Sequence, residues 1–202
     1  MNSVKNLFLL LLLTYGSFAF AQPDKTKKAR WPYERGIIQY SITGDAKGQA
    51  KLTFHEYGWK SLEHREMSFV RYGVTSEEAR MEITDNTDLI KINLNTKTGI
   101  RSKDATLYNL LSYKNSPEAY EAWFTSRGGK LIGTDTILAL KCNKWEFTRG
   151  NITMLWEHQG LPLKLIKKLP GLDYEQIAIK IDTTSKLDPL AFQLPKDISW
   201  EE

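Results

Sequence analysis

Three histidines are the side chains of this sequence best suited to catalysis or to metal binding. His55, His64 and His158 stand apart from one another, and none belongs to a His-Glu-x-x-His pair or to a cluster of cysteines and histidines. No Gly-x-Ser-x-Gly turn is present to hold a serine nucleophile. The sequence therefore predicts no catalytic residue, no metal site, no cofactor and no enzymatic activity.

The single cysteine and one glycine-rich loop also favour structural roles. Cys142 is the only cysteine, so no disulfide can form within the chain. It stands in a segment of alternating apolar and polar residues, which favours a small buried side chain over a reactive thiol. The loop Gly44–Gly48 lacks the Gly-Lys-Ser/Thr ending of a phosphate-binding loop and is typical of a hairpin turn.

The first 21 residues have the features of a secretory signal peptide. Lys5 precedes the apolar run Leu7–Leu13, and Ala19-Phe20-Ala21 supplies small residues before an expected cleavage site. The apolar run is too short to cross a bilayer, which takes about 20 residues. We therefore expect export to the periplasm or outside the cell, no transmembrane segment and no nucleic-acid partner. No cysteine lies near the cleavage site to carry a lipid anchor.

The rest of the chain reads as a short terminal segment and one domain. Residues 22–35 contain the run Lys25–Arg30, which has four basic residues. We expect residues 22–35 to form a flexible basic N-terminus. Residues 36–202 show no internal repeat or linker, so we expect a single domain in a monomeric protein.

Apolar and polar residues alternate over most of this domain. Ile38, Tyr40 and Ile42 would point to one side of a strand, and the polar residues between them to the other. About ten such segments occur at hairpin spacing, which predicts a meandering antiparallel sheet. A sheet of this width curls because strand twist accumulates.

Two segments depart from the alternation and predict short helices. Asp104–Tyr113 carries leucines at helical spacing. A second helix would begin at Ser116-Pro117, bury Tyr120, Trp123 and Phe124, and end at Gly128-Gly129. The predicted fold class is therefore α+β: a strongly curved antiparallel sheet, or half-barrel, with two short helices covering its concave face.

The alternation places many apolar side chains on the concave face, more than two short helices can cover. An acyl chain bound there would gain about 0.8 kcal/mol for each buried CH₂ group. The alternative is that the same side chains form a dry core. The candidate ligand-binding residues are Ile38, Tyr40, Ile42, Leu52, Phe54, Trp145, Phe147, Met154 and Trp156.

The C-terminal half also carries a family resemblance. Three of its features resemble less characterised members of the LolA/LolB-like periplasmic lipoprotein-sorting proteins. They are a predicted strand that contains tryptophan, the turn Gly160-Leu161-Pro162-Leu163-Lys164 and the ending Phe192-Gln193-Leu194-Pro195. The opening Gly36–Ile42 is similar to theirs as well. The resemblance covers roughly 36–198 and implies a half-barrel whose cavity holds lipoprotein acyl chains. This chain differs in its short helical insert and in having no identifiable partner-docking motif.

Two functions remain open on these grounds. The first is an exported soluble binding protein that carries lipid, acyl chains or lipoproteins in its concave cavity. The second is a non-enzymatic interaction module that docks with an envelope protein partner. The face opposite the predicted cavity carries Gln39, Ser41, Lys51 and Thr53, and its polarity argues mildly against a large permanent interface.

Overall fold

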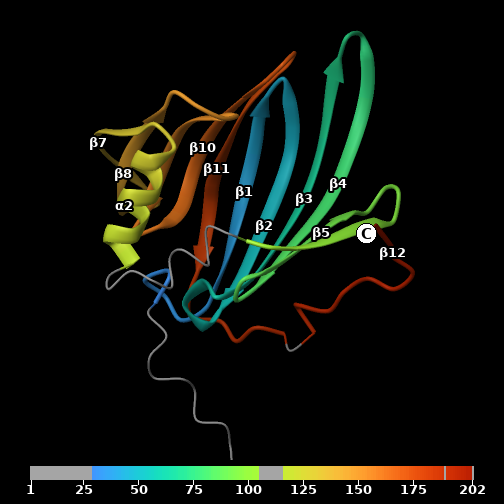
Figure 1. The fold of residues 1–202 in the computed structure, drawn as a ribbon, viewed down its shortest axis with the longest axis horizontal. Helices are drawn as coiled ribbons and strands as arrows, with labels where there is room; N and C mark the ends of the chain where they lie inside the picture. The colour runs from blue at the N-terminus through green and yellow to red at the C-terminus, as the bar shows by residue number, and fades with distance from the viewer. Residues whose placement is uncertain (1–28, 105–115, 189, 202) are drawn as a thin grey trace, which may run out of the picture.

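One mixed sheet of twelve strands forms most of the structure (Figure 1). The computed structural model describes residues 29–104, 116–188 and 190–201. Within them the helices are α2 (Ser116–Ser126) and the short 3-10 turn η1 (Glu56–Gly58). The strands are β1 (Gly36–Gly44), β2 (Ala46–His55), β3 (Lys60–Arg71), β4 (Val74–Asp85), β5 (Asp88–Asn93), β6 (Thr98–Lys103), β7 (Gly129–Ile137), β8 (Leu140–Phe147), β9 (Ile152–His158), β10 (Leu161–Leu169), β11 (Leu172–Asp182) and β12 (Ser199–Glu201).

The sheet consists of two antiparallel meanders joined near its middle. Its strand order is β12-β6-β5-β4-β3-β2-β1-β11-β10-β9-β8-β7, so β1 and β11 connect the two meanders. Strand β12 lies parallel to β6, and every other neighbouring pair is antiparallel. After β11 the chain returns along one end of the sheet to place β12 at the β6 edge (Figure 1).

Tight turns fix the register of the strands that carry the site. Tyr72 and Gly73 both have positive φ values, 52° and 77°, between the paired residues Arg71 and Val74. Two residues of positive φ are the requirement of a type I′ hairpin, whose twist matches that of the strands. This turn pairs β3 with β4 over the whole length of both strands.

Two clusters of buried apolar side chains hold the sheet together. The larger one joins β1, β2 and β11 with β8–β10 and includes Ile38, Phe54 and Leu163. The second lies between α2 and strands β8 and β9, where the Phe124 and Trp145 ring centroids are 5.0 Å apart. Helix α2 therefore covers only one end of the sheet, next to β7 and β8 (Figure 1).

The architecture agrees with the predicted one in outline and differs in detail. A largely antiparallel sheet and the helix beginning at Ser116 are confirmed, with Tyr120 and Phe124 buried. The structure is mostly β and has twelve strands instead of about ten. Strand β7 is exposed along Lys130–Thr136 and β12 has three residues, so neither shows the expected alternation. The other predicted helix, Asp104–Tyr113, lies outside the described residues except for Asp104.

The N-terminal segment is described from residue 29 onward. Arg30 and Trp31, the part of the expected flexible segment next to β1, contact the turn η1: both backbone amides donate to the carbonyl of Tyr57. Trp31 is 3% exposed and its indole Nε1 donates to the Gly160 carbonyl at 3.1 Å. The expected signal peptide, 1–21, lies outside the described residues. No helix in the described ranges has the length and apolarity to cross a membrane.

Candidate functional site

The nine apolar residues predicted to bind a ligand are packed against other protein atoms. Seven are buried, whereas Phe147 and Met154 are half-buried. They divide between the two core clusters: Trp145 and Phe147 lie near α2, and the others in or against the larger cluster. Ligand contact at these positions therefore stays a prediction, and so does its alternative, a dry core.

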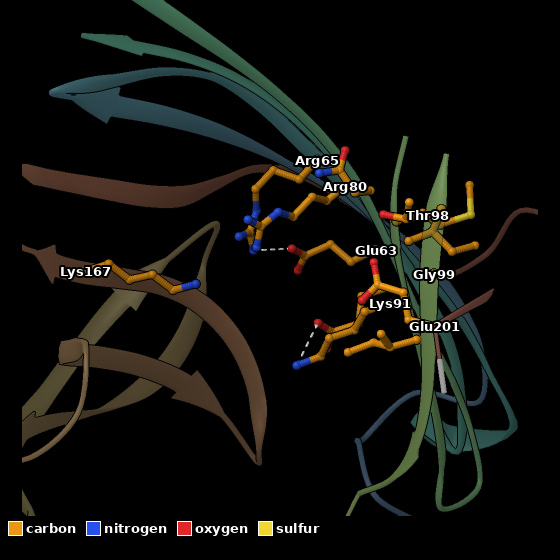
Figure 2. A pocket seen from close by; sticks show the side chains of 13 residues that line it. Glu63, Arg65, Arg80, Lys91, Thr98, Gly99, Lys167 and Glu201 are labelled. Atoms are coloured by element: carbon orange, nitrogen blue, oxygen red, sulfur yellow. Dashed lines mark hydrogen bonds and ion pairs between the residues drawn. The ribbon is translucent and has the colours of Figure 1, made fainter. Parts of the chain in front are cut away.

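A charged hollow of about 480 Å³ lies elsewhere on the sheet. It is bordered by β3, β4, β5, β6 and β12 on one side and by Lys167 of β10 on the other (Figure 2). None of the nine predicted residues lines it. Its lining is Glu63, Arg65, Arg80, Met81, Glu82, Lys91, Ile92, Asn93, Thr98, Gly99, Ile100, Lys167 and Glu201.

Strand register places the charged residues in two adjacent rows on one face of the sheet. Residues directly opposite each other on neighbouring strands share a face. The first row is acid-rich and consists of Glu63, Glu82, Lys91, Ile100 and Glu201. The second row contains no acid and consists of Arg65, Arg80, Asn93 and Thr98.

This charged face continues the apolar core face of the sheet. Ile38 pairs with Leu52, and Leu52 pairs with Glu63 on the next strand. In the adjacent row, Tyr40 pairs with Ala50, which pairs with Arg65. The face therefore changes from buried apolar to charged between β2 and β3, and the hollow lies directly beside the core.

Ion pairs satisfy part of the charge in the hollow. The Arg65 guanidinium is hydrogen-bonded to Glu63, and Arg80 Nη2 lies 3.0 Å from Glu78 Oε2. Lys91 Nζ lies 3.9 Å from Glu82 Oε2. The Nε atom of Arg65 is buried and has no hydrogen-bond partner.

Among the residues that the structure describes, Lys167 is the cation of the hollow without a carboxylate partner. In the described part of the chain it forms no ion pair, and its Nζ lies 5.8 Å from the centroid of the Tyr174 ring. Burial, followed by the charge of Arg65, lowers the pKa of Lys167 to about 8 against the opposing effect of nearby glutamates. Burial likewise raises the pKa of Glu82, although Lys91 opposes that shift.

The histidines occupy three separate places. His55 Nδ1 lies 4.0 Å from Glu56, His64 Nε2 lies 3.6 Å from Glu66, and the His158 ring contacts the Lys141 carbonyl at 2.8 Å. Among the residues that the structure describes, no group of three or more His, Cys, Asp or Glu side chains could hold a metal ion.

Sequence reasoning missed the charged residues of the hollow. The charges that flank His64 in Glu63-His64-Arg65-Glu66 favour an exposed strand, so the sequence alone does not single these residues out as a site. The turn at Tyr72-Gly73 provides a usable signal. Counting the same number of residues outward from the turn on each strand places Arg65 opposite Arg80 and Glu63 opposite Glu82. Two pairs of like charges directly opposite each other are unfavourable in a sheet, and rules of this kind are broken mainly at functional sites.

Comparison with known proteins finds solved structures that are similar at low sequence identity. No protein-family model and no curated protein sequence matches this chain. An uncharacterized conserved protein from Thermus thermophilus is 9% identical, with a TM-score of 0.49 over 84% of this chain and 91% of that one. PNGF-II is 14% identical, with a TM-score of 0.47 over 83% of this chain.

MucB, solved in complex with MucA(peri), is similar as well. It is 11% identical, with a TM-score of 0.40 over 80% of this chain. The chain spans 32% of the PNGF-II chain and 54% of the MucB chain. Identities of 14% or less with TM-scores below 0.5 carry no inference about function, so the resemblance to LolA/LolB-like proteins stays a prediction.

Proposed function

We propose that this chain is an exported, non-enzymatic binding protein of the cell envelope, and that the charged hollow is its ligand-binding site. One observation carries the proposal: Lys167 of β10 and the charged rows of β3–β6 and β12 border the same hollow. Binding sites are concave, with a few convergent polar groups beside apolar surface. The hollow is concave and adjoins the apolar core face at Leu52 and Ala50, although its own lining is mostly polar and charged.

The shared hollow also supports the half-barrel shape. Strand β10 is four positions away from β3 in the sheet order. In a flat sheet this separation corresponds to roughly 19 Å, at about 4.8 Å per strand. Curvature that brings β10 over β3 would let both strands border one cavity.

An amphiphile, such as a lipid or the acylated end of a lipoprotein, is the ligand class that suits this arrangement best. Its polar group would lie in the hollow, and its acyl chain would extend along the neighbouring apolar strands. The chain would then act as a periplasmic carrier, as the LolA/LolB-like resemblance implies. Seven of the nine predicted apolar residues are buried, so an acyl chain would have to displace part of their present packing.

Docking with an envelope protein is the second candidate function. The edge strand β7 favours it, because among the described residues it pairs with β8 alone, and its exposed stretch Lys130–Thr136 includes Leu131 and Ile132. An exposed edge strand offers unpaired backbone groups to a partner strand. A bulge between Leu131 and Gly133 interrupts the register there and would limit such pairing.

Native mass spectrometry of the mature chain, purified from an envelope fraction without detergent, tests the proposed function. We expect a bound molecule that is lost in a Thr98→Trp variant, because Thr98 lines the hollow and an indole would fill it. The matched control is Thr136→Trp, which adds the same ring at an exposed position of β7.

Two results would contradict the proposed function. One is the absence of any co-purified ligand together with no uptake of a fluorescent fatty acid. The other is a ligand that both tryptophan variants retain equally. A photo-crosslinker at Ile132 that captures one envelope protein, in the absence of bound ligand, would favour the docking function instead.

A further inference from the structure

We propose that the hollow holds an anionic group, a phosphate or a carboxylate, between Lys167, Arg65 and Arg80. The inference rests on the proposed function, since it names the chemistry of the group that binds in the same hollow. It assigns the recognition of that group to three cations on three different strands, β10, β3 and β4.

The three cations converge on one part of the hollow. Arg65 and Arg80 are directly paired across β3 and β4, and both line the hollow. Figure 2 shows their side chains next to each other, with Lys167 extending toward them from the opposite side. Like charges that face each other in this way are unfavourable, and an anion placed between them would remove the repulsion.

The carboxylates already present leave donors unused. Glu63 is bonded to Arg65 and Glu78 is paired with Arg80, whereas Lys167 has no carboxylate partner in the described residues. Arg65 Nε is buried without an acceptor. Buried donors are normally satisfied by protein, water or a ligand, and a tetrahedral or planar oxyanion could accept from both Lys167 and Arg65.

The distribution of charge within the hollow directs the anion to these cations. The acids that line the hollow belong to the row of Glu63 and Glu82, and the adjacent row of Arg65, Arg80, Asn93 and Thr98 contains none; Glu78, which pairs with Arg80, lies outside the lining. An anion would therefore lie along the second row, where Asn93 and Thr98 offer further hydrogen bonds. Its negative charge would offset the burial and the Arg65 charge that lower the pKa of Lys167 to about 8.

Titration calorimetry of the mature chain tests the inference. The anionic probes are inorganic phosphate, dodecyl phosphate and dodecanoate, and dodecyl maltoside is the neutral counterpart. Lys167→Met should weaken binding of the anionic probes about tenfold or more, as expected for the loss of a charge-assisted hydrogen bond. Lys168→Met is the matched control: it removes the same charge one residue away, from an exposed side chain.

Affinity should also fall as the pH rises through about 8, where Lys167 loses its proton. The groups that face Lys167 or line the hollow with it are Glu63, Arg65, Glu78, Arg80, Glu82, Lys91, Tyr174 and Glu201. An Arg65→Lys variant keeps the charge beside Glu63 and removes the guanidinium fork. It should weaken phosphate binding while remaining folded.

The probes distinguish the two sources of the anion. Binding of inorganic phosphate alone would identify a free anion, and binding confined to the dodecyl anions would identify a lipid headgroup; both support the inference. Equal affinity for dodecyl maltoside and dodecyl phosphate, unchanged in Lys167→Met, would overturn it and leave the proposed function standing. Failure of every anionic probe to bind would overturn it whatever ligand native mass spectrometry detects.

Discussion

Lys167 is the residue whose titration reports most directly on the hollow. Burial and the charge of Arg65 lower its pKa to about 8, whereas an unfolded lysine titrates near about 10.4. Between these values the unfolded chain binds a proton that the folded chain has released. The contribution of Lys167 to the free energy of unfolding should therefore rise with pH across this window, by at most about 3 kcal/mol.

Urea denaturation between about pH 7 and about pH 10.5 measures this rise. A Lys167→Met variant supplies the reference, since Cys142 titrates in an overlapping range with the opposite sign. Burial raises the pKa of Cys142 to about 11, so the folded chain keeps a proton that the unfolded chain loses. If the free energy of unfolding depends on pH in the same way for the parent protein and for Lys167→Met, Lys167 is not desolvated.

Cys142 should also be chemically inert in the folded protein. Its side chain is 0% exposed in the larger core cluster, and Sγ lies 3.4 Å from the Leu140 carbonyl. At about pH 8 a thiol with a raised pKa carries almost no thiolate. Reaction with a disulfide reagent should follow global unfolding, and rapid labelling without denaturant would contradict the structure.

At the residue scale, sequence foresaw burial better than it foresaw the site. The alternation correctly predicts that Cys142, Ile38 and Phe54 are buried. It cannot show that the same face turns charged at Glu63 and Arg65, because that follows from the pairing of β2 with β3. Register, which turns and tertiary packing determine, is the missing information.

The segment before β1 anchors the sheet although it belongs to no strand. The Trp31 ring contacts Phe54 edge-on at 5.0 Å between centroids, and its indole donates to Gly160 on the other meander. Trp31→Ala should lower the free energy of unfolding by about 3–5 kcal/mol. Trp200→Ala is the control, because Trp200 is 39% exposed on the short strand β12; equal losses in the two variants would argue against the anchoring role.

The close approach of β2 and β3 depends on a glycine. A Cβ atom on Gly48 would lie 2.1 Å from the Glu66 carbonyl oxygen, so a side chain there forces the two strands apart. We expect Gly48→Ala to cost about 1–3 kcal/mol in chemical denaturation. The neighbouring exposed Gln49→Ala should stay within about 0.5 kcal/mol of the parent protein, and an unchanged Gly48→Ala would show that the strands are less tightly packed.

Strands and helices whose residues show a clear apolar period or turn motif were predictable from the sequence, and those without such a pattern were not. The β1–β2 hairpin follows from alternation on both sides of Gly44, and α2 from its aromatic spacing. In the described part of the chain, strand β7 pairs only with β8. Its residues are exposed on both faces from Lys130 to Thr136, so they show no apolar period. Strand β12 is held by packing of Trp200 over Gly99 and Arg101, a long-range contact that no local pattern reveals.

At the scale of the whole molecule, apolar and charged residues occupy different parts of one face of the sheet. The C-terminal meander and β1–β2 hold both core clusters, and α2 covers the end at β8 and β9. Strands β3–β6 carry the charged rows on the continuation of the same face. A ligand with one charged and one apolar part would match this division.

Amide shift mapping of the mature chain by NMR, with dodecyl phosphate as ligand, tests the central claim most directly. The account predicts shifts centred on Arg65, Asn93, Thr98 and Lys167, around the charged hollow. Shifts centred instead on Ile38, Tyr40 and Phe54, with the hollow unchanged, would contradict it and place the ligand among the apolar residues of the core.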